Sequence, residues 1–296
     1  MNLVIGASGL LGSEICRTLL KSGKPVRALV RTTTDSAKQE RLRSLGAGLA
    51  FGDLKDPSTL AAAMQGVSTV ISTASSTFSR QAGDSIETVD GQGQINLVDS
   101  AKKAGVRHFI FISFPPMAAD FALQRAKRAV EERLVQSGVA YTILQPTFFT
   151  EVWLSPAVGF DAANAQAQIF GLGRNQISWI SFPDVAKFAA ASVENPGTRN
   201  TVIQLGGPQA LSPLEVVKLF EEVGGRSFTL THVPEDALKA QKAAATNSLD
   251  EAFSALMIAY AQGNVINMDP VTRIFPQLRS RLSSVKDHAK RTLNLA

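Results

Sequence analysis

The stretch "NLVIGASGLLGSEI", residues 2–15, decides the fold. It opens with a short apolar run containing β-branched residues, which predicts a buried strand over 2–6. Three evenly spaced glycines follow, Gly6, Gly9 and Gly12, and apolar residues then recur with helical spacing. The stretch therefore predicts a strand, a tight glycine turn and a helix in direct succession.

Five similar apolar runs follow in the first half of the chain, separated by segments of helical pattern: 26–31, 48–52, 69–73, 108–113 and 141–145. Short strands with little polar alternation, each followed by a helix, are typical of a parallel sheet covered on both faces. The predicted fold class is α/β, with a doubly wound, mostly parallel Rossmann sheet.

The alternation ends after residue 145. We expect a loop over 146–156, a short strand and then a helix opening near Pro183, and a helix over 211–225 with Ser212 as its N-cap and Gly224 at its end. Further elements are expected in the remaining segments: strands at 201–207 and 227–233, helical structure over 235–262 and a last helix over 283–293. This organisation predicts a cofactor-binding domain over 1–150 and a smaller α/β substrate lobe over 151–296, packed on it rather than independent.

The composition excludes several classes of protein. The net charge is +5 over 296 residues and the basic residues are dispersed, so no nucleic-acid surface is expected. No apolar run reaches the roughly 18–20 residues that cross a bilayer. The single cysteine, Cys16, excludes an internal disulfide and is predicted to be a small buried residue. We expect a cytoplasmic protein without a signal peptide, because residues 2–6 already form a strand.

The glycine turn is the predicted binding site of a dinucleotide. Gly9 would let the backbone approach a pyrophosphate, and Gly12 would let the new helix pack closely on the strand. The free N–H groups of the helix N-terminus would then face the phosphates. The expected cofactor contacts in this stretch are Gly6, Ser8, Gly9, Leu10, Leu11 and Gly12. The alternative is a turn with a structural role only.

The end of the second strand predicts which dinucleotide binds. An acidic residue about 20 positions after the glycines would hold the ribose hydroxyls of NAD. Here Arg31 occupies that place, with Thr32 and Thr33 after it and no acid before Asp35. An arginine fork pairs well with a 2′-phosphate, so the predicted cofactor is NADP. The alternative is a solvated arginine at a strand end.

Ligands of open α/β sheets lie at the carboxyl ends of the strands. That rule predicts further cofactor contacts after the third, fourth and fifth strands: Asp53, Leu54, Thr73, Ala74, Ser75 and Ser113. For Ser113, capping of the strand end is an equally good explanation.

The helical pattern over 120–138 contains a lysine on its apolar side. One stripe at 100° per residue is formed by Leu123, Ala126, Val130 and Leu134. Lys127 lies inside this stripe, whereas Arg125, Arg128 and Glu132 point away from it, as expected of a solvated face. A lysine in such a stripe must snorkel, find a partner or line a cavity. Lys127 is therefore the predicted catalytic residue and a further cofactor contact, with snorkelling as the alternative.

Other chemistries find no support. A tyrosine one helical turn before Lys127 would complete a common hydride-transfer pair, but position 123 is leucine. The three histidines, His108, His232 and His288, lack metal-ligand spacing, so no metal is expected. No G-x-S-x-G elbow is present, and no nucleophile is paired with a base at a recognisable spacing.

Several motifs together resemble the NmrA-like branch of the atypical short-chain dehydrogenases: "GASGLLG", Arg31, "GDLKDPSTL", "VRHFIFISF" and Lys127 before "SGVAYTILQPTFF". The resemblance covers most of 1–190. It implies that Lys127 has the acid role, although Arg128 departs from the family's pattern. It also implies that Pro146, Thr147 and Phe148 flank the nicotinamide, and that Phe114, Phe148, Phe149 and Trp153 line an apolar substrate pocket, with core packing as the alternative.

Two functions follow from these features. The first is an NADPH-dependent oxidoreductase that transfers hydride to a small apolar carbonyl, enone or quinone. The second is a non-catalytic regulator that senses NADP(H), which the missing tyrosine favours. The expected partner is a small-molecule substrate and not a membrane, with a second copy of the chain or another protein as alternatives.

Overall fold

The structure, a computed structural model, describes residues 1–78, 81–278 and 280–295. The chain forms two compact units. The first unit comprises Met1–Phe114, Ala122–Gln145 and Val185–Ile203. The second unit comprises Pro115–Phe121, Pro146–Asp184 and Gln204–Ala296. A domain boundary at residue 150 stays a prediction.

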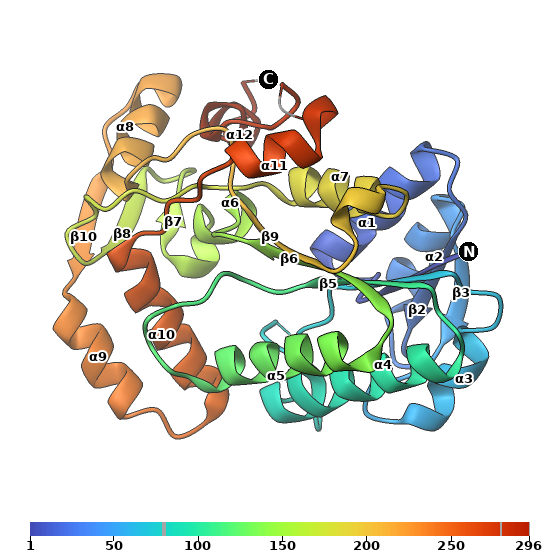
Figure 1. Ribbon diagram of the computed structural model, residues 1–296. Coiled ribbons are helices and arrows are strands. Elements are labelled where there is room, and N and C mark those ends of the chain that lie inside the picture. The colour runs from blue at the N-terminus through green and yellow to red at the C-terminus, as the bar shows by residue number, and fades with distance from the viewer. Residues whose placement is uncertain (79–80, 279, 296) are drawn as a thin grey trace. The chain divides into compact units, whose positions relative to one another are not determined.

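A seven-stranded sheet is built around the glycine stretch (Figure 1). Its strands in spatial order are β3 (Gly48–Phe51), β2 (Val26–Val30), β1 (Asn2–Ile5), β4 (Thr69–Ser72), β5 (His108–Ile112), β6 (Ala140–Pro146) and β9 (Thr201–Leu205). The pairs from β3 to β6 are all parallel, and Asn2 of β1 is aligned with Val26 of β2 and Thr69 of β4. The order reverses between β1 and β4, which is the switch point of a doubly wound sheet. The predicted fold class is confirmed.

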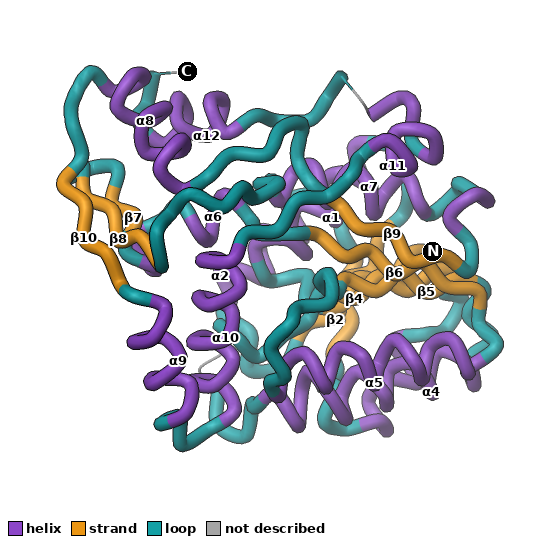
Figure 2. Tube along the Cα trace, turned by 60° about the vertical axis from the view of Figure 1, so that its left-hand side comes forward, coloured by secondary structure: helices purple, strands orange, loops and turns teal. Residues whose placement is uncertain are grey.

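Helices cover both faces of this sheet. Helices α1 (Leu10–Lys21) and α7 (Phe182–Ser192) lie on one face, and α4 (Gln94–Lys103) and α5 (Ala122–Ser137) lie on the other (Figures 1 and 2). Every residue of β1, β4 and β5 is buried, which explains why these strands are continuous apolar runs in the sequence. The remaining helices before β5 are α2 (Ser36–Ser44), α3 (Leu60–Ala63) and the π-helix η2 (Ile86–Gly93).

The second unit contains a small three-stranded sheet. Its order is β10 (Thr229–Val233), β8 (Gln166–Phe170) and β7 (Phe160–Asp161), with β8 parallel to β10 and antiparallel to β7. The helices of this unit are α6 (Thr150–Trp153), α8 (Pro213–Gly224), α9 (Glu235–Ala243), α10 (Ser248–Gln262), α11 (Asp269–Ile274) and α12 (Val285–Thr292). An apolar cluster that includes Trp179, Phe220 and Tyr260 forms the core.

The local signals of the second half are confirmed where they are strong. Ser212 caps α8 in a capping box with Glu215, and β9, β10 and α12 lie in their expected segments. The expected loop over 146–156 is wrong in part, because Thr150–Trp153 fold into the short helix α6, with Phe149 as its N-cap. The expected helical stretch over 235–262 is two helices, since Asn247 caps a new start for α10.

The expected strand before α7 is also wrong. The backbone N–H groups of Ile177, Ser178 and Ile180 bond to three different segments, at Leu211, Asn264 and Phe148. The side chains of Ile177, Trp179 and Ile180 are buried, as in a strand, but the partners are too scattered for a ladder to form. Because its side chains are buried, this segment has the apolar composition of a strand, but its backbone does not pair with a neighbouring strand.

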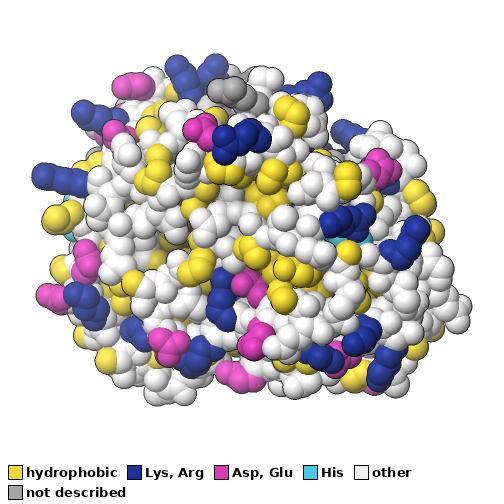
Figure 3. Space-filling view, in the orientation of Figure 1, with side chains coloured by type: hydrophobic (Ala, Val, Ile, Leu, Met, Phe, Trp, Pro, Cys, Tyr) yellow, Lys and Arg dark blue, Asp and Glu magenta, His cyan; other side chains and the backbone are white. Residues whose placement is uncertain are grey.

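Four other sequence expectations concern Cys16, membrane-spanning segments, metal ligands and the distribution of charge. Cys16 is fully buried, and burial raises the pKa of its thiol to about 12. Within residues 1–78, 81–278 and 280–295, no helix is long and apolar enough to cross a bilayer, and no cluster of histidine, cysteine and carboxylate side chains could hold a metal ion. On the face drawn in Figure 3, Lys and Arg are interspersed with Asp and Glu.

His108 predicts how stability depends on pH. Its side chain is buried, and burial, with a smaller contribution from the charge of Arg199, lowers its pKa from 6.5 to about 3. Below pH 6.5 only the unfolded chain takes up this proton, so His108 alone should lower the free energy of unfolding by about 1.4 kcal/mol per pH unit on acidification towards pH 3, in addition to the contribution of His288, whose pKa burial lowers to about 4. Urea denaturation at pH 7, 5.5 and 4.5 measures this slope. His108→Gln should reduce the slope by one proton, and an unchanged slope would contradict the assignment.

Candidate functional site

The glycine turn joins β1 to α1 at the carboxyl edge of the sheet. Gly6 has φ +76°, a conformation that favours glycine, and its carbonyl accepts a hydrogen bond from Gly9 N at 2.9 Å. A Cβ atom on Gly12 would overlap the carbonyl oxygen of Gly6 and lie 2.6 Å from its carbon. The helix therefore packs directly against the turn, and only glycine fits at position 12.

The N-terminus of α1 is open. Gly9 is its N-cap, and among the described residues no side chain caps the first turn. A Cβ atom on Gly9 would meet only the carbonyl of Gly6, at 3.2 Å, and the side chain of Leu10 is 66% exposed. Uncapped amides at a helix N-terminus, with bare backbone in front of them, suit an anionic group. The residues present therefore fit the diphosphate of a dinucleotide.

The next strand ends carry two cations that meet at one carboxylate. Arg31 follows β2, and its Nη1 lies 2.6 Å from Oδ2 of Asp84. Lys55, beyond the end of β3, forms an ion pair with the other oxygen of Asp84 and lies 3.4 Å from Asp53. The Asp84 side chain is only 2% exposed. Arg31 is thus ion-paired, with 30% of its side chain exposed, and nothing in the sequence marks Asp84 as its partner.

Of the expected cofactor residues after β3 and β4, Thr73 and Ala74 lie beside the glycine turn. Thr73 donates from both its backbone N–H and its hydroxyl to the carbonyl of Ile5, each at 3.1 Å. Ala74 lies against Gly6: a Cβ atom built on Gly6 would come within 2.9 Å of Ala74 N. Leu54 is buried, and Ser75 shares a 3.2 Å hydrogen bond with Thr77. Cofactor roles for these residues stay predictions.

The π-helix η2 and the start of α4 supply two buried polar side chains that sequence reasoning missed. Ser85 begins η2 with a capping box, Asp90 lies within η2, Gln94 is the first residue of α4, and both side chains are fully buried. Gln94 accepts from Ser72 at 2.8 Å and donates to the carbonyl of Ala74 at 2.9 Å. Such helices are rare and recur at functional sites. The apolar spacing of an ordinary helix does not reveal them.

Asp90 is the partner of Lys127. Its Oδ2 accepts from the N–H and the hydroxyl of Ser76, at 2.8 and 2.7 Å, and its Oδ1 lies 3.4 Å from the Lys127 ammonium. Lys127 is 5% exposed, and its ammonium also lies 5.0 Å from the centre of the Phe111 ring. Lys127 therefore has a buried partner, which is one of the three alternatives expected for it, and its ammonium does not snorkel to the solvent.

Arg128 was expected on a solvated face of α5, but the structure places it in a network of contacts. Its Nη2 donates to the hydroxyl of Ser113 at 3.0 Å and to the carbonyl of Phe114 at 2.5 Å, and its guanidinium lies 5.6 Å from the Phe114 ring. Glu131 pairs with it at 3.1 Å. Burial lowers the pKa of Arg128. The expectation was wrong because the residues that follow β5 reach this side of α5.

The expected aromatic pocket residues other than Phe114 belong to the second unit. Phe148 is buried and contacts Trp153 and Tyr260 edge-on, with ring centres 5.0 and 5.9 Å apart. Phe149 packs on Phe182 at 4.5 Å. Pro146 and Thr147 are buried, and the Thr147 hydroxyl bonds the carbonyl of Ser178. These contacts agree with core packing, and a pocket role stays a prediction.

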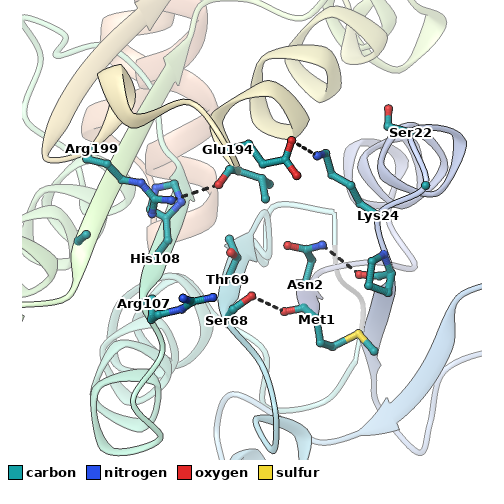
Figure 4. Close-up of a pocket in the computed structure, with 14 residues that line it drawn as sticks. Met1, Asn2, Ser22, Lys24, Ser68, Thr69, Arg107, His108, Glu194 and Arg199 are labelled. Atoms are coloured by element: carbon teal, nitrogen blue, oxygen red, sulfur yellow. Dashed lines mark hydrogen bonds and ion pairs between the residues drawn. The ribbon is translucent and has the colours of Figure 1, made fainter.

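A cavity of about 750 Å³ lies at the opposite edge of the sheet, at the amino ends of β1, β4 and β5 (Figure 4). Its basic residues sit where helices end: Lys24, beyond α1, pairs with Glu194, and Arg199 donates to the carbonyl of Val193 at 3.1 Å, just after α7. Cations at helix C-termini complement the helix dipole. The turn that runs from a strand through Gly6, Gly9 and Gly12 into a helix N-terminus lies at the carboxyl edge, so we assign the dinucleotide-binding geometry to that edge.

Comparison with known proteins agrees with this geometry. The sequence profile of the NmrA-like family matches residues 2–276. The NAD(P)H azoreductase of Xenophilus azovorans is 34% identical over 229 residues, which make up 76% of this chain and 74% of that protein. The photosystem II assembly factor Ycf39 of Trieres chinensis is 31% identical over 244 residues, covering 80% of this chain and 73% of that protein.

A solved structure shares the fold across its whole length. The triphenylmethane reductase of Citrobacter sp., complexed with NADP(H), matches with a TM-score of 0.78 at 21% identity. The match covers 99% of this chain and 100% of that one.

Proposed function

The chain belongs to the NmrA-like family, and we propose that it is an NADPH-dependent oxidoreductase that reduces a small apolar carbonyl, enone or quinone. One observation carries the proposal. An open glycine turn and a buried ammonium, that of Lys127, occur in the same unit, and the Asp90 network joins the ammonium to the residues that follow β4. The first can hold a dinucleotide, and the second can stabilise or protonate a reduced product.

The turn and the strand ends would hold the cofactor. The amides after Gly6 would bind the diphosphate, and Arg31 and Lys55 carry the positive charge that a 2′-phosphate requires. The cofactors of two similar proteins support NADP as the cofactor: one is described as an NAD(P)H azoreductase, and the triphenylmethane reductase was solved with NADP(H).

When bound, NADPH supplies a hydride. The protein supplies position and charge. Asp90 accepts two hydrogen bonds from Ser76 and so has a fixed orientation, and its ion pair holds the Lys127 ammonium in place. We propose that Lys127 Nζ donates a hydrogen bond, or its proton, to the acceptor's oxygen as negative charge develops there. Phe114, whose ring lies 5.6 Å from the Arg128 guanidinium in the same unit, is proposed to line the apolar part of the substrate site.

A turnover screen tests this function. Purified protein is mixed with NADPH and a panel of quinones, enones, aryl carbonyls and azo dyes, and the loss of absorbance at the nicotinamide band is followed. We expect oxidation of NADPH with at least one acceptor class, and much slower oxidation of NADH. Tight NADPH binding without turnover on any acceptor would contradict a reductase.

A second candidate is a regulator that binds NADP(H) without chemistry. Its support is the state of Lys127, which is 5% exposed and ion-paired rather than facing solvent. The related Ycf39 is a photosystem II assembly factor, so this family includes a protein described by an assembly role. For such a regulator, the screen would give binding without NADPH oxidation.

A further inference from the structure

Two basic side chains of the proposed cofactor site already share an anion of the protein. Arg31 and Lys55, from the ends of adjacent strands, each contact one oxygen of Asp84, and the Arg31 pair is 2.6 Å long. The Asp84 side chain is 2% exposed and those of Arg31 and Lys55 are 30% and 27% exposed, so this ion triad has a buried carboxylate and two cations that solvent reaches in part. A further hydrogen bond, from the Thr33 hydroxyl to Gln81 Oε1 at 2.9 Å, joins the same two segments.

The chemistry of this triad resembles that of a bound phosphate. A guanidinium and an ammonium that converge on two oxygens of one anion are the arrangement that holds a phosphate monoester. The Asp84 carboxylate therefore occupies the place between Arg31 and Lys55 that the negative charge of a 2′-phosphate would need. Both anions cannot neutralise the same two cations at this distance without strong repulsion.

We propose that Asp84 is an internal competitor of the 2′-phosphate and sets the affinity of the site for phosphorylated over unphosphorylated nucleotide. The inference rests on the proposed function, because it takes NADP as the cofactor. A nucleotide with a 2′-phosphate displaces the Asp84 carboxylate from Arg31 and Lys55. A nucleotide without this phosphate leaves the triad closed.

Displacement also has a structural consequence. Asp84 is followed directly by Ser85, the N-cap of η2, and η2 contains Asp90, the partner of Lys127. The segment 81–85 therefore joins the cations of the proposed phosphate site to the helix that holds the buried ammonium. Movement of Asp84 should loosen the backbone of 81–85 and the first turn of η2.

Two nucleotides isolate the effect of the phosphate. Adenosine 2′,5′-bisphosphate carries the 2′-phosphate and 5′-AMP lacks it, and calorimetry gives the affinity of each. Asp84→Asn should bind the bisphosphate about tenfold more tightly than wild type, the scale of one charge-assisted hydrogen bond, and 5′-AMP within about twofold of wild type. Asp99→Asn is the matched control, because Asp99 pairs with Arg133 between α4 and α5. It should leave both affinities unchanged.

Hydrogen exchange of the wild-type protein provides a test that does not depend on a folded variant. The bisphosphate should speed exchange of the amides over 81–85, and 5′-AMP should not. The proposal is overturned if Asp84→Asn leaves the ratio of the two affinities unchanged or lowers it, or if both nucleotides protect 81–85 equally. If neither nucleotide binds, the assignment of NADP as the cofactor fails. If the turnover screen finds no acceptor, the reductase function fails, but the two nucleotide affinities still test the role of Asp84.

Discussion

Replacing Gly12 by alanine is expected to abolish NADPH binding and to destabilise the first unit. The new methyl group would overlap the carbonyl oxygen of Gly6 and lie 2.9 Å from Ala7 Cα, and both are backbone atoms that cannot turn aside. Overpacking against backbone should cost about 3 kcal/mol or more of unfolding free energy. Thermal unfolding and calorimetric titration with NADPH measure the two effects.

Two other glycines separate folding from binding. Gly9→Ala places its methyl group where only the Gly6 carbonyl is near, at 3.2 Å, so stability should change by about 1 kcal/mol at most. The same methyl group would stand in front of the open amides, so NADPH affinity should still fall at least about tenfold. Gly48→Ala, in β3 with no atom closer than 3.8 Å, should behave as wild type. A Gly12→Ala protein with normal stability and affinity would refute this geometry.

Removing the charge of Lys127 should have the largest effect on turnover. Lys127→Met keeps the length of the side chain but removes the ammonium, and the rate with the best acceptor should fall by about 10²–10⁴-fold. The variant also leaves Asp90 buried without its counter-ion, so we expect a loss of about 3–5 kcal/mol in stability. Steady-state rates and urea denaturation provide the readouts.

Lys127→Arg retains a positive charge and should keep more of the activity than Lys127→Met. Arg133→Met is the matched control on the same helix, since its ion pair with Asp99 is more than one-third exposed and worth little. It should change neither rate nor stability appreciably. Wild-type turnover by Lys127→Met would remove Lys127 from the reaction and favour the regulator.

The parts of the fold that were predictable are those whose signal is local. Strands β1, β4 and β5 are buried along their whole length, so their sequences are unbroken apolar runs. The cap at Ser212 needs only the residues next to it. Lys127 was recognisable because the stripe of α5 has ordinary helical spacing, and burial of Leu123 and Val130 defines that stripe.

The partners of the candidate site were not predictable for the opposite reason. Arg31 meets Asp84 across 53 positions of sequence, and a single carboxylate after a loop has no pattern that marks it as a partner. Asp90 and Gln94 are fully buried, but they lie in and just after a π-helix, where the 3.6-residue period does not hold. The segment at 176–181 has a strand's composition, yet its backbone partners come from three places. In each of these places the structure depends on contacts between residues that are far apart in the sequence.

A crystal structure of the wild-type chain grown with NADPH tests the central claim most directly, that the glycine turn of the first unit binds a 2′-phosphorylated nicotinamide cofactor. We predict the diphosphate on the amides that follow Gly6, and the 2′-phosphate in contact with Arg31 and Lys55, with the Asp84 carboxylate displaced from both. A nucleotide bound instead at the opposite edge of the sheet, among Arg107 and Arg199, or one that leaves the Asp84 ion pairs intact, would contradict the account.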